Sequence, residues 1–239
     1  MQIVFAGVVP KELEYPDNNE DASVIDKNAV AVSDGASESF DAKGWAQILV
    51  RKYINRARFR ESWLVGAIEE YSILHDRETL SWSKQASFDR GSFATLLGIE
   101  FHKGSNSVDV LAIGDSLAVL ISNGHVVESY PYTSFEDFNQ SPELLSTNHF
   151  QNDFIKHQDF ISTHSVAWDL QSLKKPLLLC MTDALGKWFL RTYRSDPTVL
   201  ESLLSFRTQS EMQEFITALR KNKAIRTDDT TLVVIDLHG

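Results

Sequence analysis

Short apolar segments separated by turn residues constrain this chain more than any other feature of its sequence. Each is rich in Val, Ile and Leu and is bounded by Gly, Asn, Asp or Ser, a pattern typical of strands joined by tight turns. The predicted strands are Gln2–Val8, Ser23–Ile25, Ala29–Ser33, Ser92–Phe101, Val108–Ile113, Leu117–Ser122, Val126–Ser129, Phe160–Val166, Leu177–Met181 and Thr231–Leu237. Asn123-Gly124 predicts a hairpin because both residues tolerate positive φ, so an antiparallel arrangement follows.

Longer segments with apolar residues three or four positions apart interrupt these strands. Lys43–Arg58 and Ser62–Ser83 have this spacing and are predicted to be amphipathic helices. Two further helices are predicted at Thr198–Phe206 and Ser210–Leu219, and the second begins with Ser210 and Gln213 at capping-box spacing. This order of elements favours an α+β protein with helices outside antiparallel sheets.

Between residues 131 and 166 the apolar residues are no longer regularly spaced. Asn, Gln, Ser, His and aromatic residues are mixed there, and we interpret the region as a flap-like irregular segment. The sequence shows no internal repeat and no low-complexity linker, so we expect residues 1–239 to form a single domain.

The composition disfavours some classes of binding partner. A formal net charge of −10 repels a nucleic-acid backbone and an anionic membrane surface, so neither is expected to bind. Cys180 is the only cysteine, which excludes an intrachain disulfide and favours a reducing cytoplasm. No apolar run reaches the length needed to span a bilayer.

Aspartates stand at the ends of the predicted strands rather than in the middle of helices. The acidic sites are Asn19-Glu20-Asp21-Ala22, Ser33-Asp34-Gly35-Ala36, Gly114-Asp115-Ser116, Thr182-Asp183-Ala184 and Asp228-Asp229-Thr230-Thr231. Any one of them is explained as a turn, since Asp and Asn are common turn residues. Five such sites at strand ends instead predict carboxylates that converge.

Converging carboxylates suit hard divalent cations. Mg²⁺ and Mn²⁺ prefer oxygen ligands in octahedral coordination completed by waters. Two such ions about 3.5–4 Å apart can lower the pKa of a shared water and neutralise charge on a transferring phosphoryl group. The sequence has no histidine cluster at zinc spacing, no Walker glycine loop and no Gly-x-Ser-x-Gly elbow.

In order and spacing, the acidic sites together with Gly91-Ser92-Phe93-Ala94 resemble the motif series of the PPM (type 2C) metal-dependent serine/threonine protein phosphatases. The chain looks like a divergent, bacterial-type member. The resemblance spans nearly the whole chain and implies a four-layer α-β-β-α sandwich with two antiparallel sheets flanked by helices. It also implies two Mn²⁺ or Mg²⁺ ions, with a third in many members, a phosphoprotein substrate and a partner kinase system.

The resemblance also implies a set of site residues. The implied metal ligands are Glu20, Asp21, Asp34, Gly35, Asp115, Asp183 and Asp228, and the implied catalytic residues among them are Asp34, Asp183 and Asp228. Asp34 would bridge the two ions, Gly35 would offer its backbone carbonyl, and Glu20 would hold a metal-bound water. Asp115, with Asp183, matches the position of the third ion, and it fits equally well as a cap on a tight turn.

The chain departs from the family pattern in its phosphate-binding and acid groups. Pro16 stands where many members have an arginine that can grip the substrate phosphate. The candidate substitutes are Lys11 and an arginine from the surroundings of residues 131–165. Ala36 stands where relatives have histidine or glycine. Histidines in or beside the flap are alternative candidates for protonating a leaving group, namely His149, His157 and His164.

Two other functions stay open on the sequence. One is a pseudophosphatase that binds or regulates without turnover, although none of the implied carboxylate ligands has been lost. The other is a phosphatase that uses the same residues on a small phosphate ester. Leu117 replaces a common arginine and Ala184 a common glycine, whose replacement is tolerated only if the φ angle there is negative. These departures fit a divergent enzyme better than an inactive one, because every implied carboxylate ligand remains.

Overall fold

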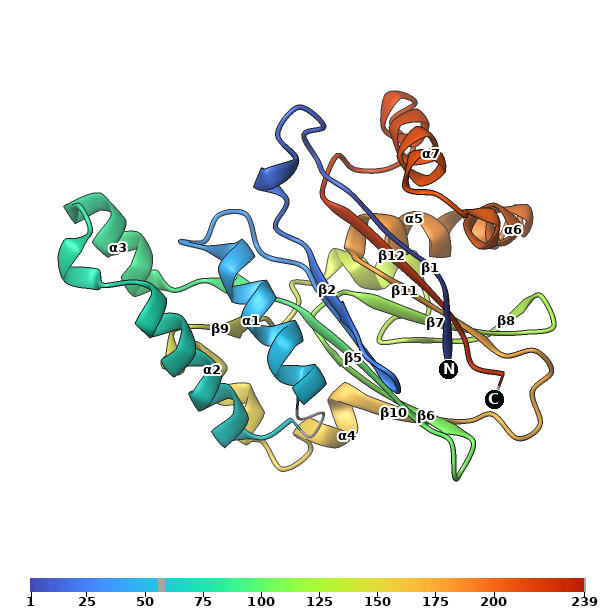
Figure 1. Cartoon of the computed structure of the whole chain (residues 1–239), viewed down its shortest axis with the longest axis horizontal. Coiled ribbons are helices and arrows are strands. Elements are labelled where there is room, and N and C mark those ends of the chain that lie inside the picture. The colour runs from blue at the N-terminus through green and yellow to red at the C-terminus, as the bar shows by residue number, and fades with distance from the viewer. Residues whose placement is uncertain (56–58, 239) are drawn as a thin grey trace.

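Two five-stranded antiparallel sheets form the centre of the molecule in a computed structural model that describes residues 1–55 and 59–238 (Figure 1). Sheet A has the order β1-β12-β11-β7-β8 and sheet B the order β10-β6-β5-β3-β2. Sheet A consists of β1 (Gln2–Val9), β12 (Thr230–Asp236), β11 (Leu177–Met181), β7 (Leu117–Ser122) and β8 (His125–Tyr130). Sheet B consists of β10 (Ser165–Asp169), β6 (Ser107–Ile113), β5 (Leu96–His102), β3 (Ala29–Ser33) and β2 (Ala22–Ile25).

Side chains along each strand alternate between the core that lies between the two sheets and the core beneath the outer helices. In β11, Leu178 and Cys180 pack between the two sheets, whereas Leu179 and Met181 face the helices beside sheet A. Because strand side chains point alternately to opposite faces, a fully apolar strand must be covered on both sides. The chain therefore needs helices outside each sheet.

Helices supply both outer layers. Helices α1 (Ala42–Asn55) and α2 (Glu61–Leu74) cover sheet B, and α5 (Asp183–Tyr193), α6 (Thr198–Ser205) and α7 (Gln209–Lys221) cover sheet A (Figure 1). The expected four-layer α-β-β-α sandwich is confirmed. That residues 1–239 form a single domain stays a prediction.

The predicted helices need three corrections. Ser62–Ser83 is not one helix, because α2 ends at Leu74 and the next helix, α3 (Trp82–Arg90), begins only at Trp82. Between them lie the extended residues His75 and Asp76 and a 3-10 turn, η2 (Arg77–Thr79). Helix α5 was not predicted. The capping box uses Thr208 and Glu211, not Ser210 and Gln213. Residues 56–58 of the predicted helix Lys43–Arg58 lie outside the described residues.

Two predicted strands were also wrong in part. Ser92–Phe101 divides into β4 (Phe93–Ala94), which pairs with β9 (Leu145–Ser146), and β5. The first residues of Phe160–Val166 form helix α4 (Phe160–His164), and β10 begins only at Ser165. The Asn123-Gly124 hairpin is confirmed, with φ angles of 50° and 80°.

The flap-like segment is more regular than predicted. It contains the 3-10 segments η3 (Phe135–Asn139) and η4 (His149–Lys156), besides β9 and α4. The buried side chain of Asn152 bonds both the N–H and the carbonyl of Ser146, which fixes η4 to β9. The segment is thereby anchored beside β4, one residue before Thr95.

Across the described part of the chain, every helix is too short or too polar to cross a bilayer.

Candidate metal centre

The five predicted aspartates converge at one end of the β-sandwich. Asp21 precedes β2, Asp34 follows β3, and Asp115 lies between β6 and β7. Asp183 is the second residue after β11, and Asp228 lies two residues before β12. Burial, followed by the charges of the other four, raises the pKa of Asp34 well above its usual range. The structure therefore places Asp34 in the middle of the group.

Asp21 ties the two sheets together. It lies at the start of sheet B, and its Oδ2 accepts hydrogen bonds from Thr231 Oγ1 of β12 in sheet A at 2.7 Å and from Thr182 Oγ1, directly after β11, at 3.1 Å. Burial raises the pKa of Asp21 to about 8, although these hydroxyls lower it. Its other oxygen, Oδ1, is buried without a hydrogen-bond partner.

Backbone contacts fix Asp34 and Gly35. The backbone of Asp34 makes two hydrogen bonds with Thr95: its N–H donates to the Thr95 side-chain Oγ1 at 2.8 Å, and its carbonyl accepts from the Thr95 N–H at 2.9 Å. Gly35 bridges to Ala94, and a Cβ there would lie 2.9 Å from the backbone of Ala42 at the start of α1. Position 35 thus requires glycine because α1 packs directly against it.

Asp115 occupies the tight turn between β6 and β7. Gly114 precedes it with a φ of 101°, and a Cβ at that position would lie 2.6 Å from Thr95. Burial, and then the charge of Asp183, raises the pKa of Asp115 to about 6. Asp115 is therefore both a turn residue and a member of the acidic group.

Arg226 lies between two of the aspartates and was missed in the sequence. Its Nη2 donates to Asp183 Oδ2 at 2.9 Å and also to Asp228 Oδ2. The side chains of Asp183 and Asp228 are 14% and 22% exposed, whereas that of Arg226 is 65% exposed. The only available signal was its place two residues before Asp228, outside any recognisable motif.

Glu20 is held at the rim by a lysine. Its Oε2 accepts from Lys11 Nζ at 2.7 Å and from the Ser37 hydroxyl. The buried carboxylate of Asp229 holds the backbone at Lys11 and at Glu20. Its Oδ1 accepts a hydrogen bond from the Lys11 N–H, and its Oδ2 accepts one from the Glu20 N–H. Asp229 was not predicted as a site residue, and its role is to position Glu20.

The donor set fits hard cations. Asp21 Oδ1 and Asp183 Oδ1 are buried with no hydrogen-bond partner among the described residues, so the protein itself leaves these carboxyl oxygens unsatisfied. Within residues 1–55 and 59–238, no group of three or more acidic, histidine or cysteine side chains is placed so that it could hold a metal ion. The carboxylates are instead spread around Asp34, and Arg226 provides the cation at one side.

In metal-free protein, we expect the free energy of unfolding to fall as pH rises from about 4 to about 8. Asp21, with its pKa raised from 3.8 to about 8, keeps a proton in the folded state that the unfolded chain has already lost. Its contribution is complete below the unfolded pKa and is lost as pH rises through the folded pKa. Urea denaturation of EDTA-treated protein at pH 6 and 8.5 measures the difference.

Asp21→Asn should remove much of this pH dependence, because an amide does not titrate. Asp26→Asn is the matched control, since Asp26 is an exposed residue in the turn at the other end of the β2–β3 hairpin. A denaturation midpoint that is constant or rises with pH would contradict the assignment.

No protein-family model matches the sequence, and no curated protein matches it. Among solved structures, a bacterial serine phosphatase superposes with a TM-score of 0.60 at 16% identity, covering 99% of this chain and 98% of its own. The Mycobacterium tuberculosis serine/threonine phosphatase PstP/Ppp superposes with a TM-score of 0.57 at 16% identity over the whole of both chains.

A catalytic domain of PstP in complex with two manganese ions also matches, with a TM-score of 0.57 and 17% identity over 98% of each chain. This chain has the PPM phosphatase fold. At these identities the likeness establishes the fold alone, and the chemistry must be argued from the residues.

Two of the departures from the PPM pattern, Pro16 and Ala184, have structural explanations. Pro16 begins an exposed 3-10 turn, η1 (Pro16–Asn18), where its fixed φ suits the first position. Ala184 lies in the first turn of α5 and is not among the described residues with positive φ, so its methyl group causes no strain. His164 contacts Glu143 and the carbonyl of Phe160 through its two ring nitrogens. It is therefore already engaged within the flap.

Proposed function

We propose that this protein is a metal-dependent phosphatase that hydrolyses phosphoserine or phosphothreonine in proteins. The observation that carries the proposal is the convergence of five aspartates around Asp34, two of them with an unpartnered buried oxygen. A phosphoprotein substrate, an opposing kinase and a cytoplasmic location belong to the same proposal. The PPM fold supports it, because the phosphatases with similar structures share that fold.

The aspartates are the groups that would hold Mn²⁺ or Mg²⁺. Asp34, in the centre, would serve both ions, Gly35 would add its backbone carbonyl, and Asp115 would serve a third ion. The remaining ligands would be Asp21, Asp183 and Asp228, with Glu20 at the rim. Such ions supply charge neutralisation at the phosphoryl group and a water of lowered pKa.

Arg226 is the group we assign to the substrate phosphate, in place of the arginine that other members have at the position of Pro16. A guanidinium has five donors, and the contacts with Asp183 and Asp228 use only Nη2. Its large exposure leaves the other donors available at the mouth of the site. Lys11, the earlier candidate, is instead paired with Glu20 and Ser37.

Arg226→Gln is therefore expected to raise the KM for p-nitrophenyl phosphate about tenfold at saturating Mn²⁺, with a smaller change in kcat. A contact that holds ground and transition states alike affects binding more than turnover. Arg194→Gln is the control, because Arg194 is an exposed arginine whose side chain makes a single hydrogen bond within the described residues, to the Thr133 carbonyl at 3.4 Å. An unchanged KM would show that Arg226 serves only to hold Asp183 and Asp228.

The function itself is tested by assaying p-nitrophenyl phosphate and a phosphothreonine peptide with Mn²⁺. Turnover of both supports a protein phosphatase. Turnover of the small ester alone would assign the site to a small phosphate ester. Tight peptide binding without turnover of either compound would favour a pseudophosphatase.

A further inference from the structure

A groove of about 410 Å³ leads away from the proposed metal centre between α5 and the flap. Asp115 and Asp183 form its inner end together with Arg226. Lys187 and Arg191 line it further out, along α5. The groove is therefore continuous with the position at which the substrate phosphate would lie.

The cations are regularly spaced along α5. Asp183, Lys187 and Arg191 are four residues apart, which places them in one row on the helix surface. Because an α-helix rises 1.5 Å per residue, the two cations stand about 6 and 12 Å along the axis from Asp183.

The groove is basic in a protein that is acidic as a whole. The chain has a formal net charge of −10, yet the charged residues of the groove other than the proposed ligands Asp115 and Asp183 are all cations. Lys187 donates to Asn139 Oδ1 at 3.0 Å, and Arg191 donates to the Ala224 carbonyl. Neither cation forms a salt bridge within the described residues, so both charges are available to an anion.

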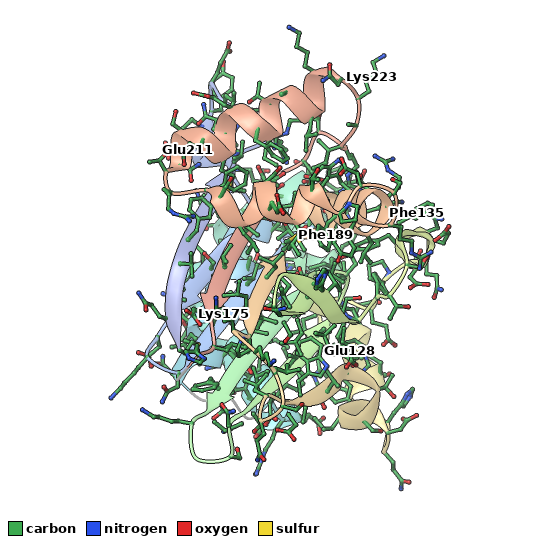
Figure 2. All side chains as sticks on the ribbon, turned by 90° about the vertical axis from the view of Figure 1, so that its right-hand side faces the viewer. Glu128, Phe135, Lys175, Phe189, Glu211 and Lys223 are labelled. Atoms are coloured by element: carbon green, nitrogen blue, oxygen red, sulfur yellow. The ribbon has the colours of Figure 1, made fainter. Side chains whose placement is uncertain are left out.

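Apolar side chains surround these charges. Phe138, Trp188 and Ile225 line the groove, and Trp188 and Ile225 are buried in the core beside sheet A. Figure 2 shows η3, with Phe135, beside the helix that carries Phe189, and the Lys187–Asn139 hydrogen bond joins the same two elements. The groove is thus a formed surface between packed elements, and side chains bound there would be partly shielded from water.

We propose that this groove binds acidic side chains of the phosphoprotein substrate on one side of the phosphorylated residue. The inference rests on the proposed function and narrows it to acidic phosphorylation sites. An extended peptide advances about 3.3 Å per residue. Lys187 therefore corresponds to a position about two residues from the phosphoresidue, and Arg191 to one about three to four residues away.

Peptide binding tests the proposal without requiring turnover. The probes are fluorescein-labelled peptides that carry a non-hydrolysable difluoromethylene phosphonate analogue of phosphothreonine, with Glu at two and four positions before it, with Glu at two and four positions after it, or with Gln at all four. Fluorescence anisotropy in Mn²⁺ measures Kd. One of the two Glu peptides is expected to bind about five- to tenfold more tightly than the Gln peptide, as two partly exposed ion pairs would provide.

Lys187→Gln with Arg191→Gln should remove this preference and leave the affinity for the Gln peptide within about twofold. The control pair is Lys103→Gln with Lys174→Gln, which makes the same change of charge on exposed loops away from the groove. Asn139→Ala removes the contact of Lys187 with the flap but keeps its charge, and should keep the preference. Rising ionic strength should weaken the preference.

Equal Kd values for the three peptides, or an equal effect of the groove and control pairs, would overturn the proposal. Turnover measurements distinguish a failure of the groove proposal from a failure of the proposed function on which it rests. If acidic peptides bind preferentially but neither p-nitrophenyl phosphate nor a phosphothreonine peptide is hydrolysed, the groove stands and the proposed function fails. If p-nitrophenyl phosphate and the phosphothreonine peptide are both hydrolysed but acidic peptides bind no more tightly than the Gln peptide, the function stands and the groove assignment fails.

Discussion

Asp34→Asn is expected to lower kcat about a hundredfold or more while leaving the fold intact. The substitution keeps the volume of the side chain but removes the charged oxygen at the centre of the aspartate group, on which both ions would depend. Metal ions supply several kcal/mol of transition-state stabilisation, and each 1.4 kcal/mol corresponds to about a tenfold change in rate. The measurement is kcat for p-nitrophenyl phosphate at several Mn²⁺ concentrations, with far-UV circular dichroism to verify folding.

Asp183→Asn should have a comparable effect, and the double variant should be little worse than either single variant. Residues that act as one unit give non-additive losses. Asp26→Asn is the control, because it makes the same chemical change at the far end of the hairpin that carries Asp34. If both site variants turned over at near-normal rates with metal present, the ligand assignment would be wrong.

Removal of divalent metal is expected to lower the rate about a thousandfold or more. The described site offers crowded carboxylates as its reactive groups, and these repel an anionic phosphate until cations neutralise them. Phosphate release after EDTA treatment and gel filtration, followed by titration with Mn²⁺ or Mg²⁺, measures the dependence.

Asp34→Asn provides the control here, since its residual rate should respond weakly to added metal. A search for a trapped ³²P-labelled phosphoenzyme should find none, because hydrolysis by an activated water has no covalent intermediate. Metal-independent turnover or a labelled protein would contradict the mechanism.

Much of the architecture could be predicted because the strands carry a strong signal. The segments Leu117–Ser122 and Leu177–Met181 are apolar on both faces and end at turn residues, and the structure places them side by side in sheet A. The positions of the acids at strand ends predicted their convergence, which the structure shows. Their role as metal ligands stays a prediction.

The missed elements had weak or misleading local signals. Helix α5 begins one residue after β11, and its first turn, Asp183-Ala184-Leu185-Gly186, reads as a turn that follows a strand. Gly186 weakens the helical signal, yet a Cβ there would lie 3.0 Å from Leu117, so the close approach of α5 to β7 favours glycine. Tertiary packing, rather than intrinsic helix propensity, therefore determines that this segment is helical.

The side-chain contacts within the site could not be predicted, because they depend on residues far apart in the chain. Asp229 holds the Glu20 loop from 209 positions away, and Arg226 reaches Asp183 from 43 positions away. Neither residue's own neighbours in the sequence indicate its partner. Only the closed sandwich defines these pairs.

The link from Asp21 to Thr231 has a consequence for the order of folding events. It joins residues 210 positions apart, so the carboxylate group can assemble only after most of the chain has found its place. An ion that needs this group has no preformed site on the nascent chain. Bound metal would therefore slow unfolding rather than accelerate folding. The lifetime of the folded protein would then depend on metal supply more strongly than its folding rate would.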